Sequence, residues 1–239
     1  MLHVHVAVLK EPRGFIKILQ FVLAILAFST TVGFSTYFTF HATVAGCNSG
    51  SQNVVRKDVS YPFALDSQVV RQQLCADPPR TERFHFATDV SSHAKFFVAV
   101  GVICMLHAVL ALAGYVLFSD HYVNQRIIPT VDFVTHALLA AMWLVAASAW
   151  ASGLGALKSG ADPGQQLNQL CDQLHNVDCR VAGDDHRGTF GKLNASLCFG
   201  FLNVFVWAGN LWFLFKETVW YKPRTSPSAS ATTTAAAPA

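Results

Sequence analysis

The chain has 239 residues, of which 52% are hydrophobic and only 13% are charged, and its formal net charge is +3. Soluble domains carry about twice this share of charged residues, so the composition indicates that lipid solvates much of the chain. No basic run interleaved with aromatic residues is present, and so small and scattered a charge excludes nucleic acid as a partner.

Four apolar stretches are each long enough to cross a hydrocarbon core, which takes about 20 helical residues. They are expected at residues 15–40, 96–118, 131–154 and 195–215. Only helices satisfy every backbone polar group of such continuous apolar segments inside lipid. The sequence therefore predicts an all-α fold, a bundle of four transmembrane helices over residues 15–218, between an N-terminal segment 1–14 and a tail 219–239.

The first stretch is followed by Val44-Ala45-Gly46-Cys47, which resembles a bacterial lipoprotein cleavage site. The apolar region before it is much longer than the roughly 7–15 residues of a signal peptide, and three more apolar stretches follow. We therefore expect the first stretch to remain as a membrane span.

Long polar segments join the first span to the second and the third to the fourth, so both lie on one face of the membrane. Cys47 and Cys75 fall in the first segment and Cys171 and Cys179 in the second, whereas residues 119–130 and both tails contain no cysteine. Paired cysteines confined to one side indicate disulfides in an oxidising compartment, which makes these loops lumenal and both termini cytosolic. Four cysteines permit three connectivities, and pairing within each loop needs the fewest assumptions. The alternative is four unpaired thiols.

Basic residues near the ends of the spans indicate the same orientation. The positive-inside rule gives most weight to charges close to span ends. The charges on the expected cytosolic side crowd the first and last spans: Lys10, Arg13, Lys17, Lys216, Lys222 and Arg224.

Polar residues inside the spans are candidate functional residues, because ionisable groups in lipid are costly. His107 and His136 can face one another or a cavity, and the alternative is a pair of neutral imidazoles hydrogen-bonded within the bundle. Asn203 and Asn210 lie seven residues apart on one helix face. We expect them to form hydrogen bonds between helices or with a partner.

Small residues mark a further candidate packing face in the third span. Ala147, Ala151 and Gly155 recur every four residues, which allows close approach of another helix, although small residues are generally common in membrane helices. Asn194 opens the glycosylation sequon Asn194-Ala195-Ser196. Its place at the start of the fourth span is close to the bilayer, where access of the transferase is restricted.

No catalytic constellation is visible in the sequence. There is no metal-ligand spacing, no phosphate-binding loop and no Ser, His and acid set that the pattern would bring together. We therefore predict a protein that is not an enzyme and has no cofactor and no metal. The tail at residues 219–239 is rich in Ser, Thr, Ala and Pro and is expected to be disordered.

Several segments resemble the synaptophysin family of vesicle proteins, which have a MARVEL-type fold. The resemblance covers about residues 10–220 and includes the order of the motifs and the two pairs of loop cysteines. The motifs are K-E-P-R-G-F-I-K-I-L-Q-F at Lys10–Phe21, M-W-L-V-A-A-S-A-W-A at Met142–Ala151, and F-G-F-L-N-V-F-V-W-A-G-N-L-W-F-L-F-K-E-T at Phe199–Thr218.

The resemblance implies a non-enzymatic vesicle membrane protein that forms homo-oligomers, associates with cholesterol-rich membrane and binds the vesicle SNARE synaptobrevin. The short tail lacks the Tyr/Gly-rich repeats of the neuronal family member, so no role of that tail is implied. Two alternatives remain: an oligomeric channel lined by polar span residues, and a junctional membrane-organising protein of MARVEL type.

Overall fold

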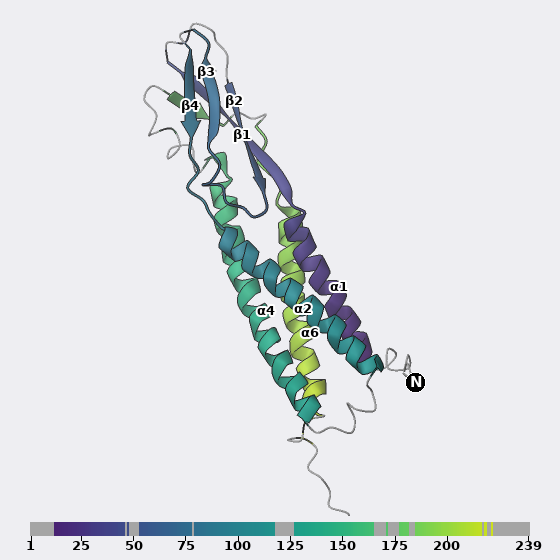
Figure 1. The fold of residues 1–239 in the computed structure, drawn as a ribbon. Coiled ribbons are helices and arrows are strands. Elements are labelled where there is room, and N and C mark those ends of the chain that lie inside the picture. The colour runs from purple at the N-terminus through teal and green to yellow at the C-terminus, as the bar shows by residue number, and fades with distance from the viewer. Residues whose placement is uncertain are drawn as a thin grey trace, which may run out of the picture.

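The computed structural model describes residues 12–45, 47, 53–77, 79–117, 127–164, 171, 177–181, 185–216, 218 and 221. Four long helices form a bundle, and a strand-rich part stands at one end of it (Figure 1). We call this end the loop side, and the opposite end, where the first helix begins and the last one ends, the terminal side. The helices are α1 (Pro12–Val32), α2 (Ser91–Leu117), α4 (Ile127–Gly160) and α6 (Gly191–Phe215). The strands are β1 (Ser35–Val44), β2 (Asn53–Ser60), β3 (Val70–Cys75), β4 (Arg80–Phe84) and β5 (Val177–Arg180).

All four helices are long and apolar enough to cross a membrane, which confirms the predicted number of spans. At 1.5 Å per residue, the 34 residues of α4 extend about 50 Å, well beyond a hydrocarbon core of about 30 Å. Part of α4 therefore projects out of the lipid. The helices α2, α4 and α6 also begin before the spans predicted from the sequence, at Ser91, Ile127 and Gly191 respectively.

The expected all-α fold is incomplete, because the segments between spans form β-structure. The predicted first span, 15–40, is also too long: α1 ends at Val32 and β1 begins at Ser35. The residues of β1, S-T-Y-F-T-F-H-A-T-V, are mostly β-branched or aromatic, which favours a strand. Phe38, Phe40 and Ala42 alternate into the core with at most 2% exposure, as the period of two requires.

The two loops that the sequence separates are joined in one sheet. Its order is β2-β1-β5, with Ala42 of β1 opposite Cys179 of β5, while β3 and β4 form a separate antiparallel pair. The disulfides join Cys47 to Cys75 and Cys171 to Cys179, which is the pairing within each loop. Strand pairing between the loops and cross-links within them therefore build a single unit.

Aromatic rings connect this unit to the bundle. Phe63, in the loop between β2 and β3, stacks on Trp150 of α4 with ring centroids 5.6 Å apart. Phe97 of α2 contacts both Trp150 and Trp143, and all four side chains are fully buried. The hydrophobic core consequently runs without a break from the strands into the helices.

Candidate functional site

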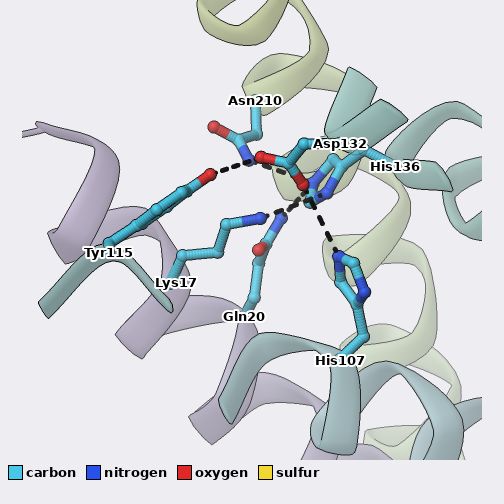
Figure 2. Close-up of polar contacts among 7 residues, drawn as sticks. All are labelled: Lys17, Gln20, His107, Tyr115, Asp132, His136 and Asn210. Carbon is cyan, nitrogen blue, oxygen red and sulfur yellow. Dashed lines mark hydrogen bonds and ion pairs between the residues drawn. The ribbon is translucent and has the colours of Figure 1, made fainter. Parts of the chain in front are cut away.

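A cluster of polar side chains lies inside the bundle, in the half nearer the terminal side. Figure 2 shows its seven residues, which come from all four helices. The second and third turns of α1 and α4, the last three turns of α2 and the end of α6 all contribute, so the cluster extends across the whole bundle. Its members are Lys17, Gln20, His107, Tyr115, Asp132, His136 and Asn210.

His136 is the centre of this cluster and is completely buried. Lys17 Nζ lies 3.2 Å from its Nδ1, and Gln20 Nε2 lies 2.8 Å from its Nε2. Asn210 Nδ2 lies 3.0 Å from the same Nε2. The imidazole therefore ties α1 and α6 to α4.

The partners of His136 determine where its hydrogen lies. An ammonium group only donates hydrogen bonds, so Nδ1 accepts from Lys17 and the neutral ring carries its hydrogen on Nε2. That hydrogen needs an acceptor, and an amide turned by half a rotation offers its oxygen in place of its nitrogen. Gln20 Oε1 is buried without a hydrogen-bond partner in the present orientation. Turning the Gln20 amide gives this hydrogen an acceptor, and the Asn210 amide has to turn in the same way, because its N–H cannot donate to an N–H.

Asp132 supplies the negative charge of the cluster. It is the only carboxylate in the four helices, all of whose residues the structure describes. Tyr115 donates its hydroxyl hydrogen to Asp132 Oδ2, and the carboxylate attracts the Lys17 ammonium. His107 Nε2 lies 3.9 Å from Asp132 Oδ1, which is too long for a hydrogen bond. One positive and one negative charge thus offset each other inside the bundle, which lowers the cost of burying them.

Helical spacing places these groups together. Lys17 and Gln20 are three residues apart on α1, and Asp132 and His136 are four apart on α4, so each pair shares a helix face. His136 also stacks on Trp207 of α6, with ring centroids 4.3 Å apart. The local sequence alone accounts for the pairing of groups within each helix, and the packing of helices brings the pairs into contact.

His107, Asp132 and His136 come close enough to resemble a metal site, with one ligand atom from each within 4.8 Å of the others. The surroundings argue against a cation. Both ring nitrogens of His136 already face hydrogen-bonding groups, and the Lys17 ammonium adds positive charge beside one of them. The arrangement is better suited to hydrogen bonding than to metal binding.

The two histidines expected to be functional candidates do lie together, with ring centroids 5.8 Å apart. Asn210 also joins the cluster, across the α4–α6 interface. Asn203 is buried but donates to the carbonyl oxygen of Phe199 in its own helix. Only one of the two asparagines therefore forms an observed hydrogen bond between helices.

The three small residues predicted to mark a packing face of α4 differ in their burial. Ala147 is fully buried next to Gly200 of α6, whereas Gly155 is exposed and a Cβ added there would meet no atom within 4 Å. Ala151, between them, is half-buried. Each step of four residues turns the helix by about 40° beyond a full turn, so the stripe rotates from the core to the surface.

Asn194 is exposed in the first turn of α6, where its Oδ1 accepts a hydrogen bond of 2.7 Å from Lys158 Nζ. The hydroxyl of Ser196, the third sequon residue, is buried. It accepts from Trp150 Nε1 at 3.0 Å and donates to the carbonyl oxygen of Leu193. Use of this sequon stays a prediction for experiment.

Lys17, Gln20, Tyr115 and Asp132 were not expected in the site. Lys17 had been interpreted as a charge at the membrane surface, yet its side chain is only 1% exposed. Asp132 carried the clearer signal, because a carboxylate within an apolar stretch requires a buried partner. Pairing that acid with the nearest basic residue of another span would have found the cluster.

The family model for MARVEL, described as a membrane-associating domain, matches residues 8–213. The matched region contains α1, α2, α4, all but the last two residues of α6, both disulfides and every residue of the polar cluster. The chain therefore belongs to the MARVEL family and is a multi-pass membrane protein.

Proposed function

We propose that this chain is a non-enzymatic organiser of transport-vesicle membrane, of synaptophysin type, with both termini in the cytosol. In this proposal it forms homo-oligomers in cholesterol-rich membrane and binds the vesicle SNARE synaptobrevin, affecting vesicle cycling and retrieval. The observation that carries the proposal is the polar cluster within a MARVEL bundle. Its groups are directed at one another across four helices, which suits a scaffold better than a catalyst.

The motifs shared with the synaptophysin family support this choice within MARVEL. They contribute much of the buried contact between α4 and α6. Trp143, Ala147 and Trp150 come from one motif and Gly200 and Trp207 from the other. The resemblance therefore includes the residues that set how these two helices pack.

A different face of α4 is the better candidate for a partner helix. Ala147, Asn203 and Asn210 were expected to contact partners, but all three are buried in the bundle. Exposed small residues instead follow one another along the outer side of α4. They are Ser148, Ser152, Gly155, Ala156 and Ser159. Small side chains let helix backbones approach closely in lipid, so this face suits the single span of a SNARE.

Affinity purification tests the partner. The tagged chain is recovered from its native membranes in mild detergent and probed for synaptobrevin, with an unrelated four-span vesicle protein as the control. We expect selective recovery by this chain. Absence of synaptobrevin, while the homo-oligomer survives, would contradict the SNARE proposal and leave the fold untouched.

A pair of variants locates the contact. Ser152→Phe places a large side chain on the exposed small-residue face of α4, and Ile103→Phe makes a similar change at an exposed position of α2. Recovery of synaptobrevin should fall only with Ser152→Phe. Equal recovery by both variants would move the contact to another surface.

Labelling with an impermeant reagent tests the location. A vesicle resident is mostly protected from the reagent at the surface of intact cells, whereas a junctional MARVEL protein is labelled. Predominant surface labelling would replace the vesicle proposal with the junctional alternative.

A pore is the second candidate function, and the exposed serines of α4 favour it. If oligomers turned this face inward, its hydroxyl groups would line a path through the assembly. Purified protein in liposomes then releases small ions, and Ser152→Phe reduces that flux. Liposomes that stay impermeable with the oligomer present would exclude the pore.

A further inference from the structure

Two arginines lie directly opposite each other on the exposed face of the β3–β4 hairpin. Arg71 of β3 is opposite Arg83 of β4 in the register of the pair, and both side chains are exposed. Residues directly opposite in antiparallel strands have Cβ atoms about 4.5–5.5 Å apart, and like charges at such positions are destabilising. The folded hairpin therefore holds two positive charges together at a cost to its stability.

Neither guanidinium group is neutralised by a neighbour. Among the residues that the structure describes, neither Arg71 nor Arg83 makes an ion pair or a side-chain hydrogen bond. The nearest acid along β4, Glu82, lies on the opposite face, where its carboxylate pairs with Arg80. An anion from outside the chain would relieve the repulsion, and a guanidinium group binds a carboxylate well, through two parallel hydrogen bonds.

The backbone of β4 offers a second contact next to Arg83. In the part of the chain that the structure describes, β4 pairs with β3 alone, and residues 81–84 make no backbone hydrogen bond to any other segment. Alternate residues of a strand direct their N–H and C=O groups away from the paired neighbour. Such an edge accepts an extended peptide as an additional strand.

The hairpin extends beyond the ends of the helices on the loop side (Figure 1). Its inner face is buried through Leu74 and Phe84, while Gln73 and Thr81 lie opposite each other on the exposed face, next to the arginines. A polar face in this position is in contact with water and not with the hydrocarbon core. It therefore suits a water-soluble partner.

We propose that β4 binds an extended acidic peptide segment of another protein as a third strand, with a Glu or Asp side chain opposite Arg83. A residue directly opposite Arg83 on the added strand points to the same face, so its carboxylate lies beside the guanidinium group. Repulsion from Arg71 favours positions of the Arg83 guanidinium on the side of the added strand. A sulfated glycan would also satisfy the charge, but it would leave the edge of β4 unpaired, so the two observations together favour the peptide.

Peptide binding tests this surface independently of the vesicle role and of the SNARE contact on α4. The full chain, purified in a non-ionic detergent, is titrated into a fluorescently labelled short peptide of alternating Val and Glu, and binding is followed by anisotropy. A peptide with Lys in place of Glu is the control. We expect the Glu peptide to bind and the Lys peptide to bind more weakly, on the order of tenfold or more. No binding of the Glu peptide, or equal binding of both, would overturn the proposal.

Two arginines provide a matched pair of variants. Arg56 of β2 is also exposed, but its guanidinium group pairs with Asp58 Oδ1 at 3.0 Å and covers the ring of Tyr37. Arg83→Gln should weaken binding of the Glu peptide on the order of tenfold, whereas Arg56→Gln, which removes the same charge, should leave it within about twofold. Equal weakening by both would assign the attraction to net charge and overturn the site.

The melting temperature shows that loss of binding does not come from unfolding. Arg83→Gln should melt no lower than wild type, because the change removes the repulsion from Arg71. A clearly lower melting temperature would mean that Arg83 stabilises the hairpin itself, which would overturn the argument for an external anion.

Two further measurements separate strand pairing from charge alone. A Val–Glu peptide with N-methylated amides keeps its carboxylates but cannot donate backbone hydrogen bonds, so it should bind on the order of tenfold more weakly. Hydrogen exchange should show that the parent peptide protects the amides of β4 and not those of β2. Equal binding of the N-methylated peptide would overturn the added strand. If a heparin fragment also bound more tightly than the parent peptide, the face would be assigned to a sulfated glycan instead.

Discussion

The imidazole of His136 lies nearly parallel to the indole of Trp207, with ring centroids 4.3 Å apart and an interplanar angle of 17°. The stack places one face of the imidazole against α6, while its two nitrogens face groups on α1 and α6. One face and both nitrogens of this ring are therefore in contact with neighbouring helices. His136 holds three helices in register through one residue, which gives it a larger structural role than the other histidine of the pair.

Replacing His136 with Leu is expected to destabilise the bundle by about 3 to 5 kcal/mol. The change leaves the Lys17 ammonium and the amides of Gln20 and Asn210 buried without their common partner. Unfolding of the purified protein by SDS titration in mixed micelles measures the loss. His107→Leu is the matched control, because His107 Nε2 makes no hydrogen bond, and it should cost clearly less. Equal losses would show that burial of an imidazole, rather than its hydrogen bonds, stabilises this cluster.

Lys17 and Asp132 are expected to be energetically coupled. Lys17→Met leaves a carboxylate buried beside Tyr115, and Asp132→Asn leaves an ammonium buried beside His136. Each single change should cost about 3 kcal/mol or more, because an uncompensated charge remains. The double variant removes both charges and should be more stable than the sum of the two losses predicts, by about 1 to 3 kcal/mol. Strict additivity in the same SDS titration would mean that the two charges do not stabilise one another.

The sequence predicted the number of helices and the positions of their apolar centres, because length and apolarity alone identify spans. It did not predict that the first apolar stretch changes from helix to strand, since a window of hydrophobic residues looks the same in both. Gly33 and the alternation of Phe38, Phe40 and Ala42 carried that information. The pairing of β1 with β5 depends on contact between segments more than 130 residues apart in sequence, such as Thr43 and Asp178, which no local pattern contains.

The sequence also predicted only part of the polar cluster, because contacts between helices are not visible in a local pattern. His107, His136 and Asn210 were identifiable because polar groups in apolar stretches stand out. Which of them meet depends on helix rotation, and the sequence does not fix it: Asn203 and Asn210 share a face by spacing, but only Asn210 reaches His136. Lys17 was misplaced because a basic residue near a span end can either reach the surface or turn inward. Only the position of Asp132 on a neighbouring helix distinguishes the two.

The two disulfides are expected to stabilise the strand-rich unit unequally. In the chain-entropy model a cross-link contributes more when it closes a longer loop. Cys47 and Cys75 are separated by 28 residues and Cys171 and Cys179 by 8, which corresponds to about 3.5 and about 2.5 kcal/mol. The Cys47→Ser/Cys75→Ser variant should therefore unfold at a lower temperature than Cys171→Ser/Cys179→Ser. The reverse order would indicate that the pairing of β5 with β1 depends on the shorter cross-link.

The start of α2 should give the loop side a measurable dependence on pH. Asp89 Oδ1 accepts a hydrogen bond of 2.8 Å from the backbone N–H of Ser91, and this bond holds the pKa of the carboxyl below its usual value of 3.8. Because the folded state favours the carboxylate, this stabilisation is complete above the ordinary pKa and is lost as the pH falls through the lowered one. Asp89→Asn keeps an oxygen acceptor for Ser91 but has no charge to titrate.

Wild type should therefore melt at a higher temperature than Asp89→Asn at pH 7, and the difference should shrink as the pH falls below about 3.8. Melting of the purified chain in detergent, measured at matched ionic strength, tests this. Asp77→Asn is the control, because it removes an equivalent charge after β3, away from the start of α2. If the difference between wild type and Asp89→Asn stayed constant from pH 7 to pH 3, the charge of Asp89 would contribute nothing beyond its hydrogen bond. If Asp77→Asn followed the same curve, the effect would come from the net charge of the loop side and not from the contact with Ser91.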